Sequence, residues 1–314
     1  MLLGLILALG GLSVLTLASD QFVKGAARLA VVFDVAPVVV GAVVIGFGTS
    51  APEMVVSGLA AFDGNLDIGV GNVVGSNVAN ISLVLALASF ITVIPVSSQT
   101  VRREAPISVA AVMVFAGLIQ GDLDRWEGAV LSALLMVVLV SVLRSARSGD
   151  SLAEDVEELV GDQEYSTRRE ALRTFVGLSF VVASAWFIVE GATRIADALD
   201  LSGGFVGFTL VAVGTSAPEL VTALAAARQR ETDLLIGNLL GSNVFNSLAV
   251  GGVVGIVGPG PVLDTRLAEW GSVMMVVIVV VSWLMMITGS RVTRPEGAVL
   301  LVLWIVSVVL LSGG

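Results

Sequence analysis

Long runs of apolar residues, separated by short polar breaks, extend over almost the whole chain. A membrane-spanning helix needs roughly 20 mostly apolar residues, and by that measure the pattern predicts ten spanning helices. Their expected ranges are 2–31, 36–61, 68–91, 105–121, 126–146, 172–198, 203–229, 233–257, 267–288 and 294–312. We therefore expect an all-α integral membrane protein.

The main polar stretch, 147–171, is rich in acidic residues and divides the apolar runs into two groups of five. Its composition is typical of a solvated linker loop with one short surface helix, and a regulatory ion site there is the less favoured alternative. The expected organisation is a first five-helix unit over 1–146, the linker, and a second five-helix unit over 172–314.

An internal repeat relates the two units at an offset of 166 residues. The segment GTSAPE at 48–53 recurs at 214–219, and GNVVGSNVAN at 71–80 recurs as GNLLGSNVFN at 237–246. Between 46–80 and 212–246, 17 of 35 positions are identical, which composition alone does not produce. Because five spans is an odd number, we expect the two repeats to cross the membrane in opposite orientations.

The distribution of basic residues predicts which way the chain crosses the membrane. If the linker 147–171 is cytoplasmic, 13 of the 16 Lys and Arg residues fall at cytoplasmic helix ends. The positive-inside rule therefore predicts a cytoplasmic linker and two extracellular termini. Interrupted helices at matching places in inverted repeats are typical of secondary transporters, whose site lies between the repeats near the membrane midplane.

The repeated GTSAPE segment places a proline and a glutamate inside an apolar run. Pro52 has no N–H group, so the helix cannot bond normally around Gly48, and nearby carbonyls from Gly46 to Thr49 are expected to face the protein interior. Glu53 shares a helix face with Thr49 and Ser50. A simple proline kink with a hydrogen-bonded glutamate is disfavoured, because a carboxylate within the membrane is costly and usually functional.

The second copy has the same arrangement around Pro218 and Glu219, with Ala212, Thr215 and Ser216 in the matching places. The downstream segments add Asn72, Ser76 and Asn80, which are spaced by four residues and form one polar stripe. Asn238, Ser242 and Asn246 are their counterparts. We expect Ser76, Asn80, Ser242 and Asn246 to bind a cation. The other asparagines, including Asn77 and Asn243, are equally expected to join helices by hydrogen bonds, and the GxxxG glycines to permit close helix packing.

The composition restricts the chemistry of the site to oxygen ligands. The chain contains no Cys and no His, which excludes thiolate and imidazole chemistry, and its single lysine is not in an ATP-binding loop. Carboxylates, amides, hydroxyls and carbonyls are hard ligands, and Ca²⁺ takes 6–8 of them. Two carboxylates neutralise one Ca²⁺ or two Na⁺, so competition between these ions is expected at one site.

GTSAPE followed by GNxxGSNxxN, duplicated in inverted halves, resembles the repeats of the cation/calcium exchanger superfamily, most closely its prokaryotic Na⁺/Ca²⁺ exchangers. The resemblance covers essentially the whole chain. It implies ten helices, four central ion sites, and sliding of the first and sixth helices past the rest during alternating access. By motif position it implies these ligands: Glu53, Glu219, the carbonyls of Gly46, Thr49, Ala212 and Thr215, the hydroxyls of Ser50, Ser216, Ser76 and Ser242, and the side chains of Asn80 and Asn246.

The expected function is electrogenic Na⁺/Ca²⁺ antiport in a prokaryotic cell membrane, with Ca²⁺ and Na⁺ as transported ions and no cofactor. Several relatives have Asp where this chain has Asn246, which argues against K⁺ dependence. Ca²⁺/H⁺ antiport is the main alternative, because buried carboxyl groups can also bind protons. A cation channel is less favoured and an enzyme least. We expect a lipid-embedded monomer that does not bind nucleic acid.

Overall fold

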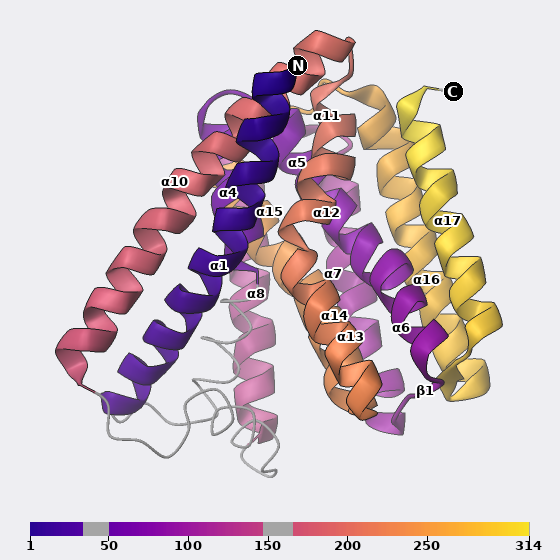
Figure 1. Ribbon diagram of the computed structural model, residues 1–314. Helices are drawn as coiled ribbons and strands as arrows, with labels where there is room; N and C mark the ends of the chain where they lie inside the picture. The colour runs from indigo at the N-terminus through magenta and orange to yellow at the C-terminus, as the bar shows by residue number, and fades with distance from the viewer. Residues whose placement is uncertain (34–49, 147–165, 314) are drawn as a thin grey trace.

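The computed structural model describes residues 1–33, 50–146 and 166–313, and they are mostly helical (Figure 1). The α-helices are α1 (Leu2–Val32), α4 (Ala51–Phe62), α5 (Leu66–Ala79), α6 (Leu85–Ile91), α7 (Ala105–Leu118), α8 (Arg125–Ala146), α10 (Thr167–Leu199), α11 (Gly203–Val206), α12 (Ala212–Thr215), α13 (Ala217–Gln229), α14 (Thr232–Phe245), α15 (Gly251–Val257), α16 (Ser272–Gly289) and α17 (Arg294–Ser312). Five π-helical segments join or extend them: η2 (Asn80–Val84), η3 (Thr100–Glu104), η4 (Gly207–Val211), η5 (Asn246–Val250) and η6 (Leu267–Gly271).

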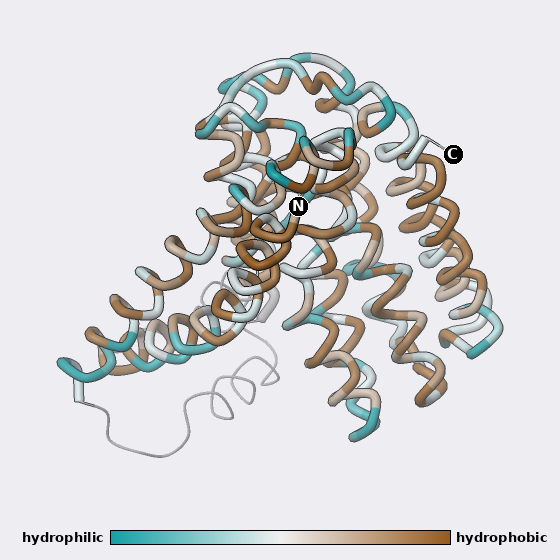
Figure 2. Tube along the Cα trace, turned by 45° about the horizontal axis from the view of Figure 1, so that its top comes forward, coloured by the Kyte–Doolittle hydropathy of each residue, from teal (hydrophilic) through white to brown (hydrophobic). Residues whose placement is uncertain are grey.

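Several helices are built to cross a membrane. Among the described residues, seven helices are long and apolar enough to span it, and the bent pair 203–215 and 217–229 would make an eighth. Hydrophobic residues dominate the middle of these helices, and hydrophilic residues gather toward their ends (Figure 2). The prediction of an all-helical membrane protein is confirmed. The number of ten spans stays a prediction, because the range 36–61 lies partly outside the described residues.

Two helices begin earlier than the apolar pattern predicts. Helix α10 begins at Thr167, inside the expected linker, and the helix expected at 105 already starts with the π-helical segment η3. Both extensions carry arginines, which a search for apolar runs does not detect. A helix can nevertheless continue through such polar turns where its backbone groups remain bonded and its charges reach water.

The helix break predicted by the second GTSAPE segment is present. Helix α12 ends at Thr215, and α13 follows at a bend of 47°. Pro218 lies in the first turn of α13, where its missing N–H leaves no internal hydrogen bond unmade. In the first copy, Pro52 occupies the same place in α4, whereas the residues before Ser50 lie outside the described part.

Matching elements recur along the chain, and short strands connect them crosswise. The starts of α5 and α14 are 166 residues apart, as are those of η2 and η5 and those of α6 and α15. Strand β1 (Ile94–Pro95) pairs with β4 (Arg291–Val292), and β2 (Asp122–Leu123) pairs with β3 (Gly260–Pro261), both antiparallel. Each pair therefore joins a segment from before the linker to one from after it.

The buried apolar side chains form two separate clusters. The larger cluster is built mainly from α5 to α8 and α13 to α17, and includes Phe115, Leu239 and Met275. The smaller cluster places α1 and α10 against α4, the start of α5 and the π-helical segment η4. Helices α1 and α10 lie side by side at one edge of the molecule, and the N-terminus and the end of α17 lie at the same end (Figure 1).

Two glycines allow α5 to lie against the backbone of the broken helix. A Cβ atom at Gly71 would lie 3.0 Å from the backbone nitrogen of Phe208, and one at Gly75 would overlap the Phe208 carbonyl oxygen and lie 2.6 Å from the Cβ of Ala212. Such spacing leaves no room for any side chain. The close approach brings the polar stripe of α5 next to α12.

Replacing Gly75 by Ala should therefore destabilise the protein. The added methyl group meets backbone atoms that cannot rotate away, and overpacking of this kind costs about 1–3 kcal/mol. We expect the thermal unfolding midpoint in detergent to fall by several degrees. Gly10→Ala is the matched control, because Gly10 is exposed and no described atom lies within 4 Å of a Cβ there. Equal midpoints for the two variants would contradict this packing.

Candidate cation-binding site

Two buried glutamates lie at matching helix starts. Glu53 is in the first turn of α4 and Glu219 is in the first turn of α13, each directly after a proline. Their exposures are 0% and 2%. The first turn of a helix has unpaired N–H groups and the positive end of the helix dipole, both of which stabilise a negative side chain. The starts of α4 and α13 thus offset part of the free-energy cost of burying a carboxylate.

A hydrogen bond connects the first glutamate to the start of the helix that carries the second. The Ser216 hydroxyl, next to the second break, donates a hydrogen bond of 3.1 Å to Glu53 Oε1, which is 163 residues away in the chain. Glu53 and Glu219 also interact electrostatically through the interior. Among the described residues, the Oε2 atom of each glutamate has no hydrogen-bond partner. Like charges that interact in a protein interior repel each other, and a cation near them would relieve this repulsion.

Asn72 connects α5 to α4 and to α12. Its Nδ2 donates to Ser57 Oγ at 2.9 Å, and its Oδ1 accepts a bond of 3.0 Å from the Thr215 hydroxyl. Ser76 Oγ lies at 3.5 Å from the same Oδ1. Asn72 is fully buried, so these bonds replace those that the amide would make with water. The amide thus acts as a link between helices, as the sequence allowed.

A second amide network joins the two copies of the GSN segment. Asn80 Nδ2 donates to Asn243 Oδ1 at 3.4 Å, and Asn243 Nδ2 donates to the Asn77 carbonyl at 3.2 Å. Asn77 Nδ2 in turn donates to Ser247 Oγ at 3.0 Å. Asn77 and Asn243 therefore join the helices, which was one of the two roles considered for them. Their bonds hold Asn80 in place beside the second copy.

The helical register changes at two of the expected ligands. The π-helical segments η2 and η5 begin at Asn80 and Asn246, respectively. A π-helical turn inserts one extra residue between hydrogen-bonded backbone groups, which changes the direction of the side chains that follow. Such turns are frequent at functional sites. Both asparagines are buried, and the Oδ1 atom of each has no partner among the described residues.

Buried oxygen atoms without a hydrogen-bond partner are concentrated in these segments. Unpaired polar atoms in a protein interior are rare and need a physical reason. Within the described part of the chain, those in the repeated motifs are Ser50 Oγ, Glu53 Oε2, Asn77 Oδ1, Asn80 Oδ1, Glu219 Oε2, Ser242 Oγ and Asn246 Oδ1. Carboxylate, amide and hydroxyl oxygens are the ligands that Ca²⁺ and Na⁺ accept, and a bound cation would satisfy them.

Most of the expected ligands are buried, and two fall outside the described residues. Gly46 and Thr49 belong to 34–49 and are not described. The Ala212 carbonyl accepts hydrogen bonds from the Ser216 N–H at 3.0 Å and from the Thr215 hydroxyl at 3.3 Å. Its remaining capacity for a cation is therefore smaller than a free carbonyl at a helix break would have.

Three buried serines escaped the sequence analysis. Ser57 and Ser247 bond to the asparagines described above, and Ser108 on α7 has a buried hydroxyl without a described partner. Ser57 lies one helical turn after Glu53, and Ser247 directly follows Asn246, so proximity to the motifs could have indicated both. Ser108 lies in an apolar run with no motif nearby, and nothing in the sequence marks it.

Within the described residues, no cluster of three or more Asp, Glu, His or Cys side chains could hold a metal ion. The site instead contains two carboxylates surrounded by neutral oxygens. Such a site has a formal charge that one divalent or two monovalent cations can balance.

Several known proteins are similar to this chain along nearly its whole length. CaxA of Alkalimonas amylolytica is 35% identical over 312 residues, with 97% of each chain covered. The sodium/calcium exchanger MaX1 of Methanosarcina acetivorans is 26% identical, with 96% of each chain covered. A solved structure of the sodium–calcium exchanger NCX_Mj, soaked with Na⁺ and Sr²⁺, matches with a TM-score of 0.66 and 30% identity, covering 98% of each chain.

The family assignment rests on both repeats rather than on one motif. The family model described as sodium/calcium exchanger protein matches residues 3–144 and 171–313, which leaves out most of the polar linker. The matched ranges include both glutamates and both asparagine-rich segments. Its members are membrane transporters, which agrees with the expectation that the chain is not an enzyme. The chain belongs to the sodium/calcium exchanger protein family.

Proposed function

We propose that this protein is an electrogenic Na⁺/Ca²⁺ antiporter that binds its ions between Glu53 and Glu219. The observation that carries the proposal is the pair of buried carboxylates, each with an oxygen that lacks a described partner. The Ser216 hydroxyl, three residues before Glu219, bonds to Glu53 and so connects the two copies of the motif. An ion entering this site gains charge neutralisation and several hard oxygen ligands.

The charge of the site gives a physical basis for exchange. One Ca²⁺ or two Na⁺ neutralise two carboxylates, so the two loadings compete for the same oxygens. A third Na⁺ would give a loaded site of net charge +1, and its transport against Ca²⁺ would move charge across the membrane. The full set of proposed ligands is Glu53, Glu219, Thr49, Thr215, Ser50, Ser216, Gly46, Ala212, Ser76, Ser242, Asn80 and Asn246.

The relatives support Na⁺ and Ca²⁺ as the transported ions. MaX1 is named as a sodium/calcium exchanger, and structures of the sodium–calcium exchanger NCX_Mj have been solved after soaking with Na⁺ and Sr²⁺ or with Na⁺ and Ca²⁺. These properties belong to those proteins. The family relationship and the oxygen-rich site together make the same ions the best candidates here.

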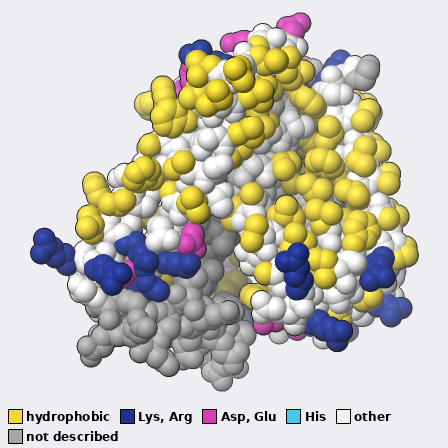
Figure 3. Space-filling model, viewed as in Figure 1, with side chains coloured by type: hydrophobic (Ala, Val, Ile, Leu, Met, Phe, Trp, Pro, Cys, Tyr) yellow, Lys and Arg dark blue, Asp and Glu magenta, His cyan; other side chains and the backbone are white. Residues whose placement is uncertain are grey.

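We further propose ten spans in two inverted repeats, over 1–146 and 172–314, with the linker 147–171 in the cytoplasm and both termini outside. The equal offsets between elements and the crosswise strand pairs support this arrangement. In Figure 3, Lys and Arg side chains gather mainly at the lower end of the molecule, where α10 begins in Figure 1, and such a concentration is typical of a cytoplasmic face. A lipid-embedded monomer in the cell membrane of a prokaryote is the simplest working unit.

Uptake of radioactive Ca²⁺ into proteoliposomes tests the proposal. Vesicles loaded with Na⁺ and diluted into Na⁺-free buffer should accumulate Ca²⁺. If three Na⁺ leave for each Ca²⁺ that enters, one net positive charge moves outward per cycle, so an inside-positive potential should speed this uptake and an inside-negative potential should slow it. Uptake that follows a pH gradient and ignores Na⁺ would instead establish Ca²⁺/H⁺ antiport. Ca²⁺ flux without any counter-ion would point to a channel.

Neutralising either central glutamate should abolish exchange. Glu53→Gln and Glu219→Gln each remove one of the two charges that balance Ca²⁺ while keeping the side-chain volume. We expect Na⁺-driven Ca²⁺ uptake to fall at least about a hundredfold, which corresponds to a loss of about 3 kcal/mol. Asp197→Asn, on the exposed face of α10, is the control and should transport normally. Wild-type rates in either Gln variant would exclude the assigned site.

Adding a carboxylate at Asn246 should change the balance between the ions. Asn246→Asp has nearly the same shape but makes the formal charge of the pocket −3, which three Na⁺ would neutralise. We expect the Na⁺ concentration for half-maximal exchange to fall several-fold, because an added negative charge nearby favours cation binding. Titration of exchange against external Na⁺ measures this. An unchanged Na⁺ dependence would place Asn246 outside the ion-binding shell.

A further inference from the structure

Helices α1 and α10 pack against each other along their length and, in the described part of the chain, share no residue with the larger apolar cluster. Both helices belong to the smaller cluster. The two helices have 31 and 33 residues, and lie along one another for most of their length (Figure 1). At 1.5 Å per residue, each is roughly 45–50 Å long, longer than the roughly 30 Å hydrocarbon layer.

Glycines bring the two helices into close contact at both ends. Near the linker, a Cβ atom at Gly25 would lie 2.6 Å from Thr174 Oγ1. At the opposite end, a Cβ atom at Gly191 would lie 2.5 Å from the backbone nitrogen of Ala8. These two contacts match one another under the 166-residue offset. The backbone packing is therefore similar at the two ends.

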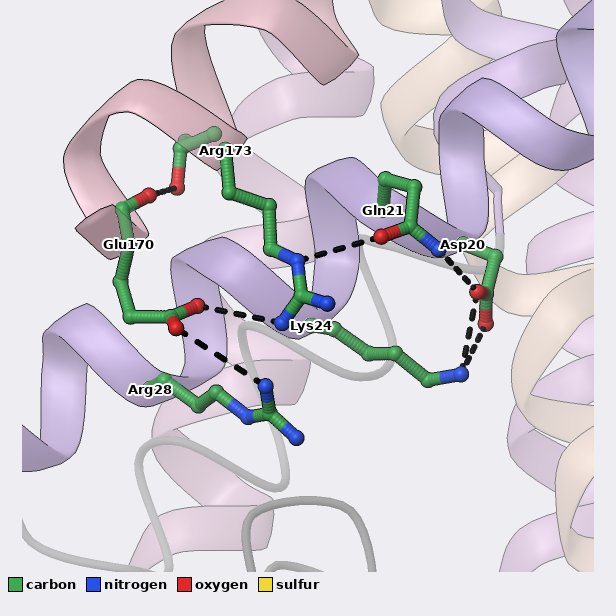
Figure 4. Close-up of polar contacts among 7 residues, drawn as sticks. Asp20, Gln21, Lys24, Arg28, Glu170 and Arg173 are labelled. Atoms are coloured by element: carbon green, nitrogen blue, oxygen red, sulfur yellow. Dashed lines mark hydrogen bonds and ion pairs between the residues drawn. The ribbon is translucent and has the colours of Figure 1, made fainter. Parts of the chain in front are cut away.

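Polar contacts, in contrast, join the helices only near the linker in the described residues (Figure 4). Glu170 on α10 is 2% exposed, and its two carboxylate oxygens face Arg28 Nη1 on α1 at 3.9 Å and Arg173 Nη1 at 3.3 Å. Arg173 Nε also donates to Gln21 Oε1 on α1 at 3.1 Å. Glu170 thus lies at the centre of a cluster that crosses between α1 and α10 twice.

The opposite end of the pair lacks such a cluster. The position that matches Glu170 under the offset is Gly4, which has no side chain. The ion pair at that end, Arg194 with Glu190, lies within α10. Among the described residues, no salt bridge joins α1 to α10 there. In the described residues, an ion pair and a hydrogen bond therefore join α1 to α10 near the linker, whereas packing alone joins them at the opposite end.

The same pair of helices contacts the broken helix of the site. The side chain of Leu12 on α1 occupies the space where a Cβ atom at Gly214 would lie. Gly214 directly precedes Thr215 and Ser216, whose hydroxyls bond to Asn72 and Glu53. Leu12 lies 13 residues before Gly25, or roughly 20 Å along the helix. A displacement of α1 would therefore change the packing at the break between α12 and α13.

We propose that Glu170 is a positioning residue that clamps the linker-side ends of α1 and α10 to each other, and that Leu12 couples the position of this helix pair to Gly214 beside the site. The proposal rests on the proposed function only for its effect on transport. Separating the two ends would break the Glu170–Arg28 ion pair and the Arg173–Gln21 hydrogen bond. Because removing a partner from a buried charge is destabilising, these contacts hold the linker-side ends together. Freedom to separate is then confined to the opposite end.

Because the sequence contains no cysteine, single cysteines can be introduced and labelled without background reaction. Spin labels are placed on exposed residues of the two helices, at Val31 and Thr167 near the linker and at Leu3 and Asp197 at the opposite end. Short-range dipolar broadening is recorded in proteoliposomes without transported ions. With Glu170→Gln, we expect the linker-side pair to show a wider range of distances and the other pair to stay unchanged.

Two further variants separate the clamp from general damage to the fold. Arg28→Gln removes a partner on α1 while Arg173 still neutralises Glu170, and it should widen the same linker-side distances. Glu190→Gln changes the ion pair within α10 and should alter neither pair of labels. Linker-side distances that stay narrow in both Glu170→Gln and Arg28→Gln would overturn the proposal.

Transport provides the second measurement. Glu170→Gln should lower the maximal rate of Na⁺-driven Ca²⁺ uptake about five- to tenfold, while half-saturating Ca²⁺ stays within about twofold, because the ligands are untouched. A raised half-saturating concentration at full maximal rate would instead assign Glu170 to ion binding and refute the clamp. If wild-type protein shows no exchange, the proposed function fails, and the label distances still decide whether the clamp exists.

Discussion

Glu53 and Glu219 lie in the interior of a protein surrounded by hydrocarbon, where an uncompensated carboxylate costs about 3 kcal/mol or more. Much of the architecture serves to reduce this cost. Prolines start new helices at both glutamates, which supplies unpaired N–H groups, and Ser216 donates a hydrogen bond across 163 residues. The compensation is incomplete, because one oxygen of each carboxylate lacks a described partner. A site left in this condition favours cations without needing to hold them permanently.

Other features that recur in both repeats are explained by the need to bury these carboxylates. Gly71 and Gly75 bring α5 against the broken helix, so Asn72 can reach Thr215 on one side and Ser57 on the other. The π-helical segments that begin at Asn80 and Asn246 change the helical register at these two buried amide side chains. Small residues, amides and breaks are thus parts of one solution to the burial of charge.

The sequence predicts which residues carry the candidate site, but not the hydrogen bonds and ion pairs between distant helices. The duplicated GTSAPE segment identified both carboxylates and the bend before α13, because the effects of proline and of buried charge are local. The bond from Ser216 to Glu53, the network through Ser247, and the ion pair of Arg28 with Glu170 depend on how distant helices meet, and no spacing along the chain encodes that. The early start of α10 was missed because arginine-rich turns resemble a loop when only hydropathy is considered.

The crosswise strand pairs have a consequence for the biogenesis of the protein. Ile94 in β1 acquires its partner Val292 only after nearly 200 more residues have been synthesised, and Asp122 in β2 must wait for Pro261. Helices inserted early therefore remain without their final neighbours until translation is almost complete. The two segments of the chain interlock, so assembly of either one is coupled to the arrival of the other, and a truncated product would hold exposed polar groups in the membrane with nothing to cover them.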